Sequence, residues 1–249
     1  MSKLIAVSGK GGVGKTTISA LLVKQLIAQG KEPVLAIDAD PNSCLDTALG
    51  VSVEHTVGSA RESVRVEAQD GRSGIAKQEL LQLKIAESLV ESRGFDLIAM
   101  GRPEGAGCYC FANNVLKSVI QAISNEYPYV VLDNEAGLEN LSRRIVAYVD
   151  ILVLVSDPSN AGLRTLSRLY DLAREMHIQY DKLVLVVNRK RSDKHADIDE
   201  VQVYTKADQV IEIPDDAEIA AYAEDSRSLL ELSGENPVLQ CMDAFIKTI

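Results

Sequence analysis

The chain lacks any hydrophobic run that approaches the roughly 20 residues needed to span a lipid bilayer. It also lacks a signal-peptide pattern, because its N-terminus leads straight into an apolar run that is predicted to form a strand. We therefore expect a cytoplasmic protein with no stable membrane insertion.

Positive charge and cysteine are also scarce. Lysine and arginine number 26 against 36 aspartates and glutamates, which gives a net charge of −10. Because such a chain repels nucleic acid overall, we expect no nucleic-acid partner and interpret the basic clusters at 143–144 and 189–191 as solvated surface. In a cytoplasmic chain of enzyme size, the four cysteines favour metal or redox chemistry over a disulfide framework.

What is present is the composition of a globular α/β protein. Of the 249 residues 46% are hydrophobic and 25% are charged, with no internal repeat and no shift in composition. Near-continuous apolar runs alternate with helical stretches, which is typical of parallel strands buried on both faces. These runs are residues 4–7, 34–37, 97–100, 129–132, 151–155, 183–187 and 210–213. The pattern predicts a doubly wound, mainly parallel sheet with helices on both faces, in a single domain of residues 1–249.

A glycine-rich loop after the first run has the spacing of a phosphate-binding site. Residues 9–16 match G-x-x-x-x-G-K-[ST] between a predicted strand and a predicted helix. Backbone N–H groups of such a loop cradle phosphates, and the helix N-terminus adds a favourable dipole. Lys15 is expected to reach the terminal phosphates, and the Thr16 hydroxyl to bind Mg²⁺. The residues expected to contact the nucleotide are Gly11, Gly12, Val13, Gly14, Lys15, Thr16 and Thr17.

A second lysine, Lys10, lies inside the loop, although the local phosphate cradle does not need it. A cation in the loop that points away from the cradle suggests a phosphate on another subunit.

Carboxylates follow two of the predicted strands. Asp133 ends an apolar strand and precedes Gly137, as does the carboxylate that holds Mg²⁺ in P-loop enzymes, directly or through water. Asp38 and Asp40 lie two residues apart, so in an extended backbone they share a side. One of this pair is expected to orient the attacking water and the other to support the metal region.

Residues 55–92 form the least regular part of the chain. Segments 61–66 and 78–90 look helical or partly helical and are separated by the glycine-containing stretch 69–74. We predict a helical insertion on the nucleotide face. The apolar residues within 238–249 have helical spacing, and we expect that helix to pack against the core.

Cys108 and Cys110 form a candidate metal site. At i and i+2 their side chains point to one side of an extended backbone, while the short loop between them disfavours a disulfide. Two thiolates fill half of a four-coordinate site, and the same pair from a second subunit would complete it. Such a site suits tetrahedral Zn²⁺ or a flattened Ni²⁺ geometry. The alternative is two buried, inert cysteines.

The remaining cysteines and histidines have no ligand-like spacing. Cys44 and Cys241 are isolated, and we expect each to be an inert core residue. His55, His177 and His195 are expected on the surface or in loops.

The loop and the acidic segments resemble those of the deviant Walker A ATPases. The matching features are Lys10 with Lys15, the Asp38-x-Asp40 pair and the segment 133–137. This class includes the division-site and chromosome-partition ATPases MinD and ParA, the nitrogenase iron protein and metallochaperone ATPases. The resemblance extends over nearly the whole chain. It implies a homodimer that sandwiches ATP, in which Lys10 reaches the phosphates of the partner subunit.

The same resemblance implies roles for residues at the strand ends. Asp40 matches the water-activating position of switch I, and Asp133 matches the switch II position. Asn188 resembles the asparagine that contacts adenine, and Pro214 and Asp215 would lie beside the base.

With the Cys-x-Cys segment added, the chain resembles the CooC-type maturation ATPases of carbon monoxide dehydrogenase, which serve nickel insertion. Residues 40–45 also look like the switch I region of that family. The leading hypothesis is an ATP-driven metallochaperone whose client is carbon monoxide dehydrogenase. Two alternatives are a MinD/ParA-like positioning ATPase that binds a membrane or nucleoid, and an ATP-dependent electron donor with a bridging iron–sulfur cluster. The chain has no second cysteine at the spacing that such a cluster uses in the nitrogenase iron protein.

Overall fold

The computed structural model describes residues 2–42, 44–69, 77–102, 117, 120, 123–138, 148–191 and 198–249. Cys108 and Cys110 lie outside the described residues, as does His195. The metal site predicted from the two cysteines therefore rests on the sequence alone.

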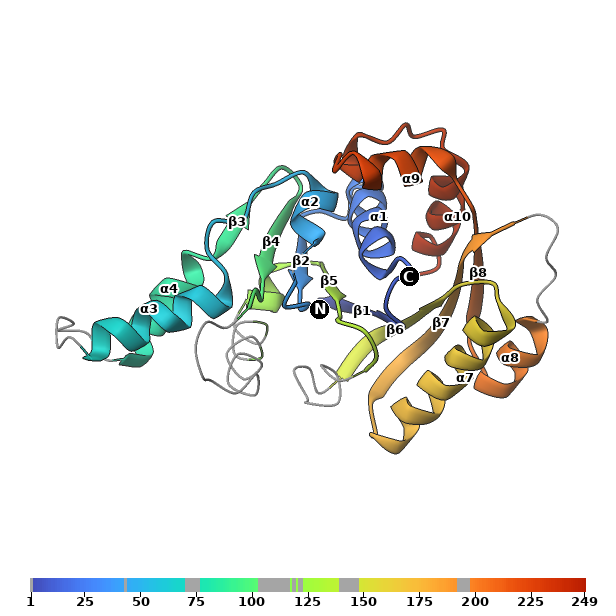
Figure 1. Cartoon of the computed structure of the whole chain (residues 1–249), viewed down its shortest axis with the longest axis horizontal. Helices are drawn as coiled ribbons and strands as arrows, with labels where there is room; N and C mark the ends of the chain where they lie inside the picture. Colours follow the sequence, from blue (N-terminus) through green and yellow to red (C-terminus); the bar gives the residue numbers. More distant parts are fainter. Residues whose placement is uncertain are drawn as a thin grey trace.

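One eight-stranded sheet runs through the molecule in the order β3-β4-β2-β5-β1-β6-β7-β8 (Figure 1). Within the described residues every strand pairing is parallel except that of β3 with β4. The strands are β1 (Lys3–Gly9), β2 (Val34–Asp38), β3 (Leu89–Glu91), β4 (Phe95–Ala99), β5 (Tyr129–Asp133), β6 (Tyr148–Ser156), β7 (Gln179–Lys190) and β8 (Gln209–Pro214). Seven of these contain or overlap the apolar runs of the sequence, so the predicted parallel sheet is confirmed.

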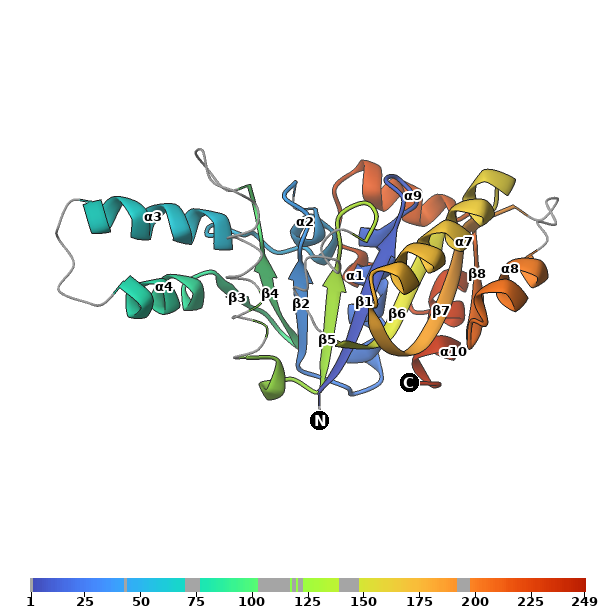
Figure 2. The same cartoon turned by 90° about the horizontal axis from the view of Figure 1, so that it is seen from below.

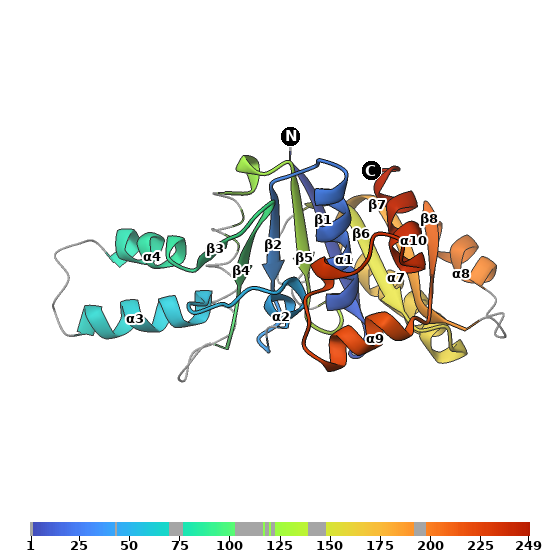
Figure 3. The same ribbon diagram turned by 90° about the horizontal axis from the view of Figure 1, so that it is seen from above.

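Helices cover both faces of the sheet. Figure 3 shows one layer in front of the sheet, with α1 (Lys15–Ala28), α2 (Leu45–Leu49), α9 (Ala217–Glu224) and α10 (Pro237–Ile246). Figure 2 shows α7 (Asn160–Glu175) and α8 (Ile198–Thr205) on the opposite face. The short 3-10 helices are η1 (Ser124–Glu126) and η2 (Leu229–Glu231).

Alternation along the strands divides the buried side chains between these two layers. In β1, Ile5 and Val7 belong to the cluster under α1 and α10, and Ala6 belongs to the cluster under α7. In β5, Val131 packs on the first side and Val130 on the second. Strands buried on both faces explain why the sequence reads there as continuous apolar runs.

The predicted insertion contains two helices, α3 (Val57–Gln69) and α4 (Lys77–Ala86), which lie side by side beyond the β3 edge of the sheet (Figures 1 and 2). Helix α3 starts at the carboxyl end of β4, where the Gly58 N–H donates to the Met100 carbonyl. The prediction of helix through residue 90 is wrong at its end, because Leu89–Glu91 forms β3. Leu89 pairs antiparallel with Ile98 of β4, and this edge pairing overrides the local helical pattern.

Helix α10 packs against the core, as predicted from the sequence, and contacts α1. Its apolar residues Val238, Leu239, Met242, Phe245 and Ile246 are all buried. Its carbonyls accept hydrogen bonds from α1 and the residues after it: Gln25 Nε2 donates to Leu239 and Lys31 Nζ donates to Ile246. In the part of the chain that the structure describes, no helix combines the length and apolarity required to cross a membrane.

Candidate nucleotide site at the carboxyl edge of the sheet

The glycine-rich loop connects the end of β1 to the start of α1. Gly12 and Gly14 have φ values of 80° and 95°, a left-handed backbone that residues with a Cβ rarely adopt. At Gly14 a Cβ atom would also lie 2.4 Å from Asn188 Nδ2. The loop therefore requires glycine at this position both for its conformation and for the close approach of β7.

Lys15 folds back over the loop. Its side chain is buried, and Nζ lies 3.4 Å from the Lys10 carbonyl oxygen, to which it donates. The ammonium group thus lies beside the backbone that the sequence predicts to bind phosphates. Lys10 itself is exposed.

Asp133 is buried at the end of β5 and bound to α1 by two hydroxyl groups. Thr16 Oγ1 donates to Asp133 Oδ2 at 2.7 Å, and Ser19 Oγ donates to Oδ1 at 3.1 Å. Burial raises the pKa of Asp133 to about 7, and the negative charge of Asp38 adds to the shift. The two carboxylates end neighbouring parallel strands, where Asp38 is in register with Asp133.

Asp38 organises the turn after β2. Its Oδ1 accepts from the Asp40 N–H, and its Oδ2 accepts from the N–H groups of Cys44 and Leu45. Burial raises its pKa to about 6 despite these three bonds. Two buried carboxylates whose charges repel each other, with the Thr16 hydroxyl beside one of them, supply oxygen atoms of the kind that Mg²⁺ prefers.

Asp40 is half-buried, and its Oδ1 accepts from the backbone N–H and the side-chain amide of Asn42. Lys10 acts electrostatically on Asp157. Hydrogen bonds with Ser159 lower the pKa of Asp157, and the positive charge of Lys10 lowers it further. Lys10 follows the last residue of β1 and Asp40 lies two residues after β2, so both lie at the carboxyl edge of the sheet.

The segment after Asp133 stays close to the loop. The Asn134 N–H donates to the Val7 carbonyl at 3.1 Å, and the Gly137 N–H donates to the Gly9 carbonyl at 2.9 Å. Gly137 has a φ of 92°, which allows the chain to turn back at this point. The predicted switch II segment is thus connected to both the first residue of the loop and the end of β1.

A cavity of about 420 Å³ lies next to the loop between α1 and α9. Asn188, Pro214 and Asp215 all line it, so the structure brings together the three residues predicted to contact the base. Arg191 also lines the cavity and forms an ion pair with Asp215 at 3.0 Å.

The opposite walls of this cavity come mostly from residues that the sequence did not indicate. Leu21 of α1 lies in one wall beside Thr17, which the sequence did predict, and Ile219 and Ala220 of α9 form another. The α9 residues belong to no nucleotide motif. The available signal was the position of α9 directly after β8, since ligands in such folds bind outside the carboxyl ends of the strands.

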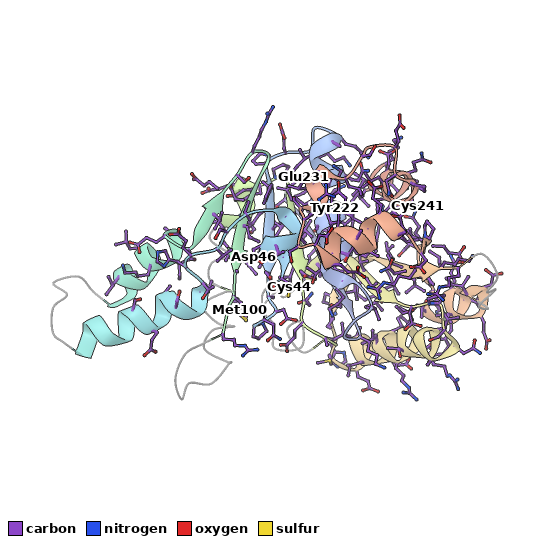
Figure 4. The ribbon with its side chains drawn as sticks, turned by 45° about the horizontal axis from the view of Figure 1, so that its top comes forward. Cys44, Asp46, Met100, Tyr222, Glu231 and Cys241 are labelled. Carbon is purple, nitrogen blue, oxygen red and sulfur yellow. The ribbon has the colours of Figure 1, made fainter. Side chains whose placement is uncertain are left out.

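The prediction that Cys44 is a core residue is wrong, because Cys44 is exposed at the start of α2 (Figure 4). The turn that Asp38 organises places the Cys44 backbone inward and leaves its thiol outside. Cys241 on α10 is partly buried against the core. His55 and His177 are exposed, as expected. Among the described residues, no three His, Cys, Asp or Glu side chains gather in a way that could hold a metal ion.

A glycine-rich loop between a buried strand and a helix, at the carboxyl edge of a parallel sheet, defines the P-loop class of nucleotide-binding proteins. The sequence profile of a family described as an AAA domain matches residues 2–185. The chain is similar to an uncharacterized ATP-binding protein of Methanocaldococcus jannaschii, with 40% identity over 248 residues that cover 99% of this chain and 98% of the relative.

The chain is also similar to the carbon monoxide dehydrogenase accessory protein CooC of Rhodospirillum rubrum, with 33% identity over 70% of each protein. A ParA family ATPase from Chlorobium tepidum TLS has the same fold, with a TM-score of 0.73, 19% identity and coverage of 100% of both chains. The chain therefore belongs to the AAA-domain family of P-loop ATPases, and its fold is that of ParA.

Proposed function

We propose that the protein is a metallochaperone that hydrolyses ATP and uses the cycle to deliver Ni²⁺ or Zn²⁺ to a client enzyme. Membership of a P-loop ATPase family supports the ATPase activity. The observation that carries the metallochaperone function is the similarity to the accessory protein CooC over 70% of the chain. The Cys-x-Cys pair of the sequence adds the chemistry that a soft or borderline metal ion needs.

At the nucleotide site, Lys15 and the loop N–H groups would bind the phosphates of ATP. Thr16, Asp38 and Asp133 would hold Mg²⁺, which neutralises charge on the phosphate oxygens. Asp40 would orient the attacking water. All three proposed Mg²⁺ ligands bind through oxygen, and two of them, Asp38 and Asp133, are buried carboxylates.

The metal site would form between two subunits. Each subunit contributes Cys108 and Cys110, so a symmetric dimer supplies four thiolates. ATP would close the same dimer through Lys10 of each subunit. If ATP and metal both prefer the closed dimer, then each raises the affinity for the other, and hydrolysis releases the metal to the client.

The metal assignment is tested with paired cysteine variants. Wild type, Cys108→Ser with Cys110→Ser, and the matched control Cys44→Ser with Cys241→Ser are incubated with Ni²⁺ or Zn²⁺. Bound metal and molecular mass are measured with and without a non-hydrolysable ATP analogue. We expect one metal ion per dimer in wild type and in the control, and loss of this metal in the first variant. Stoichiometric metal in the Cys108/Cys110 variant would show that the site lies elsewhere.

We propose carbon monoxide dehydrogenase as the client, because CooC is named as its accessory protein. Nickel-free carbon monoxide dehydrogenase would be incubated with Ni²⁺, ATP and this protein, and its activity measured. We expect activation that requires both Lys15 and the cysteine pair, and activation that is equal without ATP would contradict the proposal. The protein would act in the cytoplasm, where ATP is supplied.

A positioning function at a membrane would need a surface that binds lipid. The apolar C-terminal run that could serve is instead packed against α1, with Phe245 and Ile246 fully buried. This packing favours the metallochaperone over a membrane-binding ATPase of the MinD type.

A further inference from the structure

Two consecutive residues at the end of β7 hold two consecutive carbonyl groups of the glycine-rich loop. Asn188 Nδ2 donates to the Val13 carbonyl at 2.9 Å, and Arg189 Nη1 donates to the Gly12 carbonyl at 3.3 Å. The phosphate-loop pattern does not require the arginine. Its side chain is exposed, so burial in a core does not explain its contact with the loop.

The direction of these carbonyls determines the direction of the next N–H groups. In a planar trans peptide unit the C=O of one residue and the N–H of the next point in opposite directions. The Gly12 carbonyl shares a unit with the Val13 N–H, and the Val13 carbonyl shares one with the Gly14 N–H. Holding the two carbonyls toward β7 therefore turns both N–H groups away from it, and neighbouring N–H groups turned to one side can form an anion-binding concavity.

The backbone of Arg189 fixes the orientation of the Asn188 amide. Arg189 has a φ of 60°, which is uncommon for a residue with a side chain. Its N–H donates to Asn188 Oδ1 at 3.0 Å, so the amide must present Nδ2 to the loop. The pairing of β7 with β8 shifts register between Val187 and Lys190, which gives Arg189 room for this conformation.

We propose that Asn188 and Arg189 are positioning residues that aim the Val13 and Gly14 N–H groups at the nucleotide phosphates before the nucleotide binds. The inference rests on the proposed nucleotide site at the loop and adds two residues to its function. A loop ordered in advance loses less conformational freedom on binding, so the nucleotide binds more tightly.

The test compares Arg189→Ala, Arg189→Lys, Lys15→Ala and the matched control Lys190→Ala in the full chain. Lys190 is the next residue, carries the same charge and pairs with Glu212 instead of the loop. The Kd of Mg·ADP is measured by calorimetry at low and high salt, together with KM, kcat and hydrogen exchange of the loop peptide in the nucleotide-free protein.

We expect Arg189→Ala to raise Kd and KM by about three- to tenfold, as for loss of one ordinary, solvent-exposed hydrogen bond, while kcat changes less than twofold. Exchange of the loop amides should become faster, and the increase in Kd should persist at high salt. Arg189→Lys should restore part of the affinity, and Lys190→Ala should match wild type.

Two results would overturn the inference while leaving the nucleotide site intact. One is wild-type affinity and loop exchange in Arg189→Ala when Lys15→Ala has lost nucleotide binding. The other is an equal, salt-sensitive loss in Lys190→Ala, which would show a general effect of charge. Undiminished nucleotide binding by Lys15→Ala would instead contradict the proposed nucleotide site itself.

Discussion

Thr16 at the start of α1 donates a 2.7 Å hydrogen bond to Asp133 at the end of β5. This bond joins the two parts of the proposed Mg²⁺ site across the layer between helix and sheet. Ser19, one turn further along α1, donates to the other carboxylate oxygen of the same aspartate. The two hydroxyls therefore hold Asp133 in the same way, but only Thr16 belongs to the phosphate-binding pattern.

Thr16→Ala and Ser19→Ala should thus differ in their effect on hydrolysis. We expect Thr16→Ala to lower Mg²⁺-dependent hydrolysis by at least about 10- to 100-fold, the loss typical of an outer-shell partner, because it removes a proposed metal ligand. Ser19→Ala should reduce stability by about 1 kcal/mol through a lost buried hydrogen bond, with a smaller effect on the rate. Hydrolysis at saturating Mg·ATP and thermal unfolding measure the two effects. Equal loss of rate in both variants would mean that Thr16 acts only by holding Asp133.

Gly14→Ala should abolish tight nucleotide binding. The substitution places a Cβ at a φ of 95° and within 2.4 Å of Asn188 Nδ2, so either the loop or the asparagine must move. We expect the Kd of Mg·ADP to rise more than about tenfold, which corresponds to about 1.4 kcal/mol. Gly234→Ala is the control, because a Cβ at Gly234 meets no atom within 4 Å. Normal binding by Gly14→Ala would contradict the contact between the loop and β7.

The stability of the nucleotide-free and Mg²⁺-free protein should depend on pH through Asp133. Its pKa is 3.8 in a solvated chain and about 7 in the folded protein. Between these values the folded state retains a proton that the unfolded state has released, so rising pH lowers the free energy of unfolding. Below the unfolded pKa this penalty is absent, and above the folded pKa it is complete.

Asp133→Asn removes that titration. We expect its stability relative to wild type to increase from pH 4 to pH 7 by roughly 2–4 kcal/mol and then to level off. Urea unfolding at a series of pH values measures the difference. Asp225→Asn, at an exposed aspartate, is the control and should follow wild type. A constant difference between Asp133→Asn and wild type across this range would exclude a titrating Asp133.

Most of the sheet could be predicted from the sequence, because strands that are buried on both faces appear as near-continuous apolar runs. The runs at 34–37 and 129–132 became β2 and β5 almost without change. The loop was also predictable, since its glycines are required by backbone geometry. The edge strand β3 could not be predicted. Its three residues follow a helical stretch, and they form a strand only because they pair with β4, a contact that the local sequence pattern does not contain.

Site residues could be predicted where the chemistry of the side chain indicates its function. They were missed where only the position of the residue in the fold brings it to the site. Aspartates at strand ends are visible in a sequence, and Asp38 and Asp133 do lie in register. Ile219 and Ala220 are ordinary apolar residues that become part of a cavity only when α9 packs beside the loop. Arg189 was interpreted as a solvated charge, since its contact depends on a left-handed backbone that arginine rarely adopts.

Truncation of Phe245 should destabilise the protein, because α10 is packed against the core. For the same reason, the wild-type helix should not bind lipid. Phe245 is 1% exposed between α10 and the core, so Phe245→Ala should cost about 3–5 kcal/mol of unfolding free energy. Urea unfolding measures this cost. Wild-type protein should not sediment with liposomes of anionic lipid, with or without ATP. Nucleotide-dependent sedimentation would favour the positioning function and would require α10 to leave α1.

Lys10→Ala and Lys15→Ala should separate nucleotide binding from dimer closure. Lys15 is buried against its own loop, whereas Lys10 is exposed at the sheet edge. We therefore expect Lys15→Ala to lose nucleotide binding and Lys10→Ala to bind Mg·ATP with near-normal affinity but to remain monomeric. Calorimetry gives the affinity and light scattering gives the mass.

The same two variants also test whether the dimer serves catalysis. If Lys10 contacts the phosphates of the partner subunit, a mixture of Lys10→Ala with Lys15→Ala forms one composite site, in which an intact Lys15 faces an intact Lys10. Hydrolysis should then reappear in the mixture, because each variant lacks what the other supplies. Lys24→Ala mixed with Lys15→Ala is the control, since Lys24 donates to the Leu230 carbonyl away from the loop. A mixture as inactive as its components, at concentrations where wild type dimerises, would show that Lys10 acts within its own subunit.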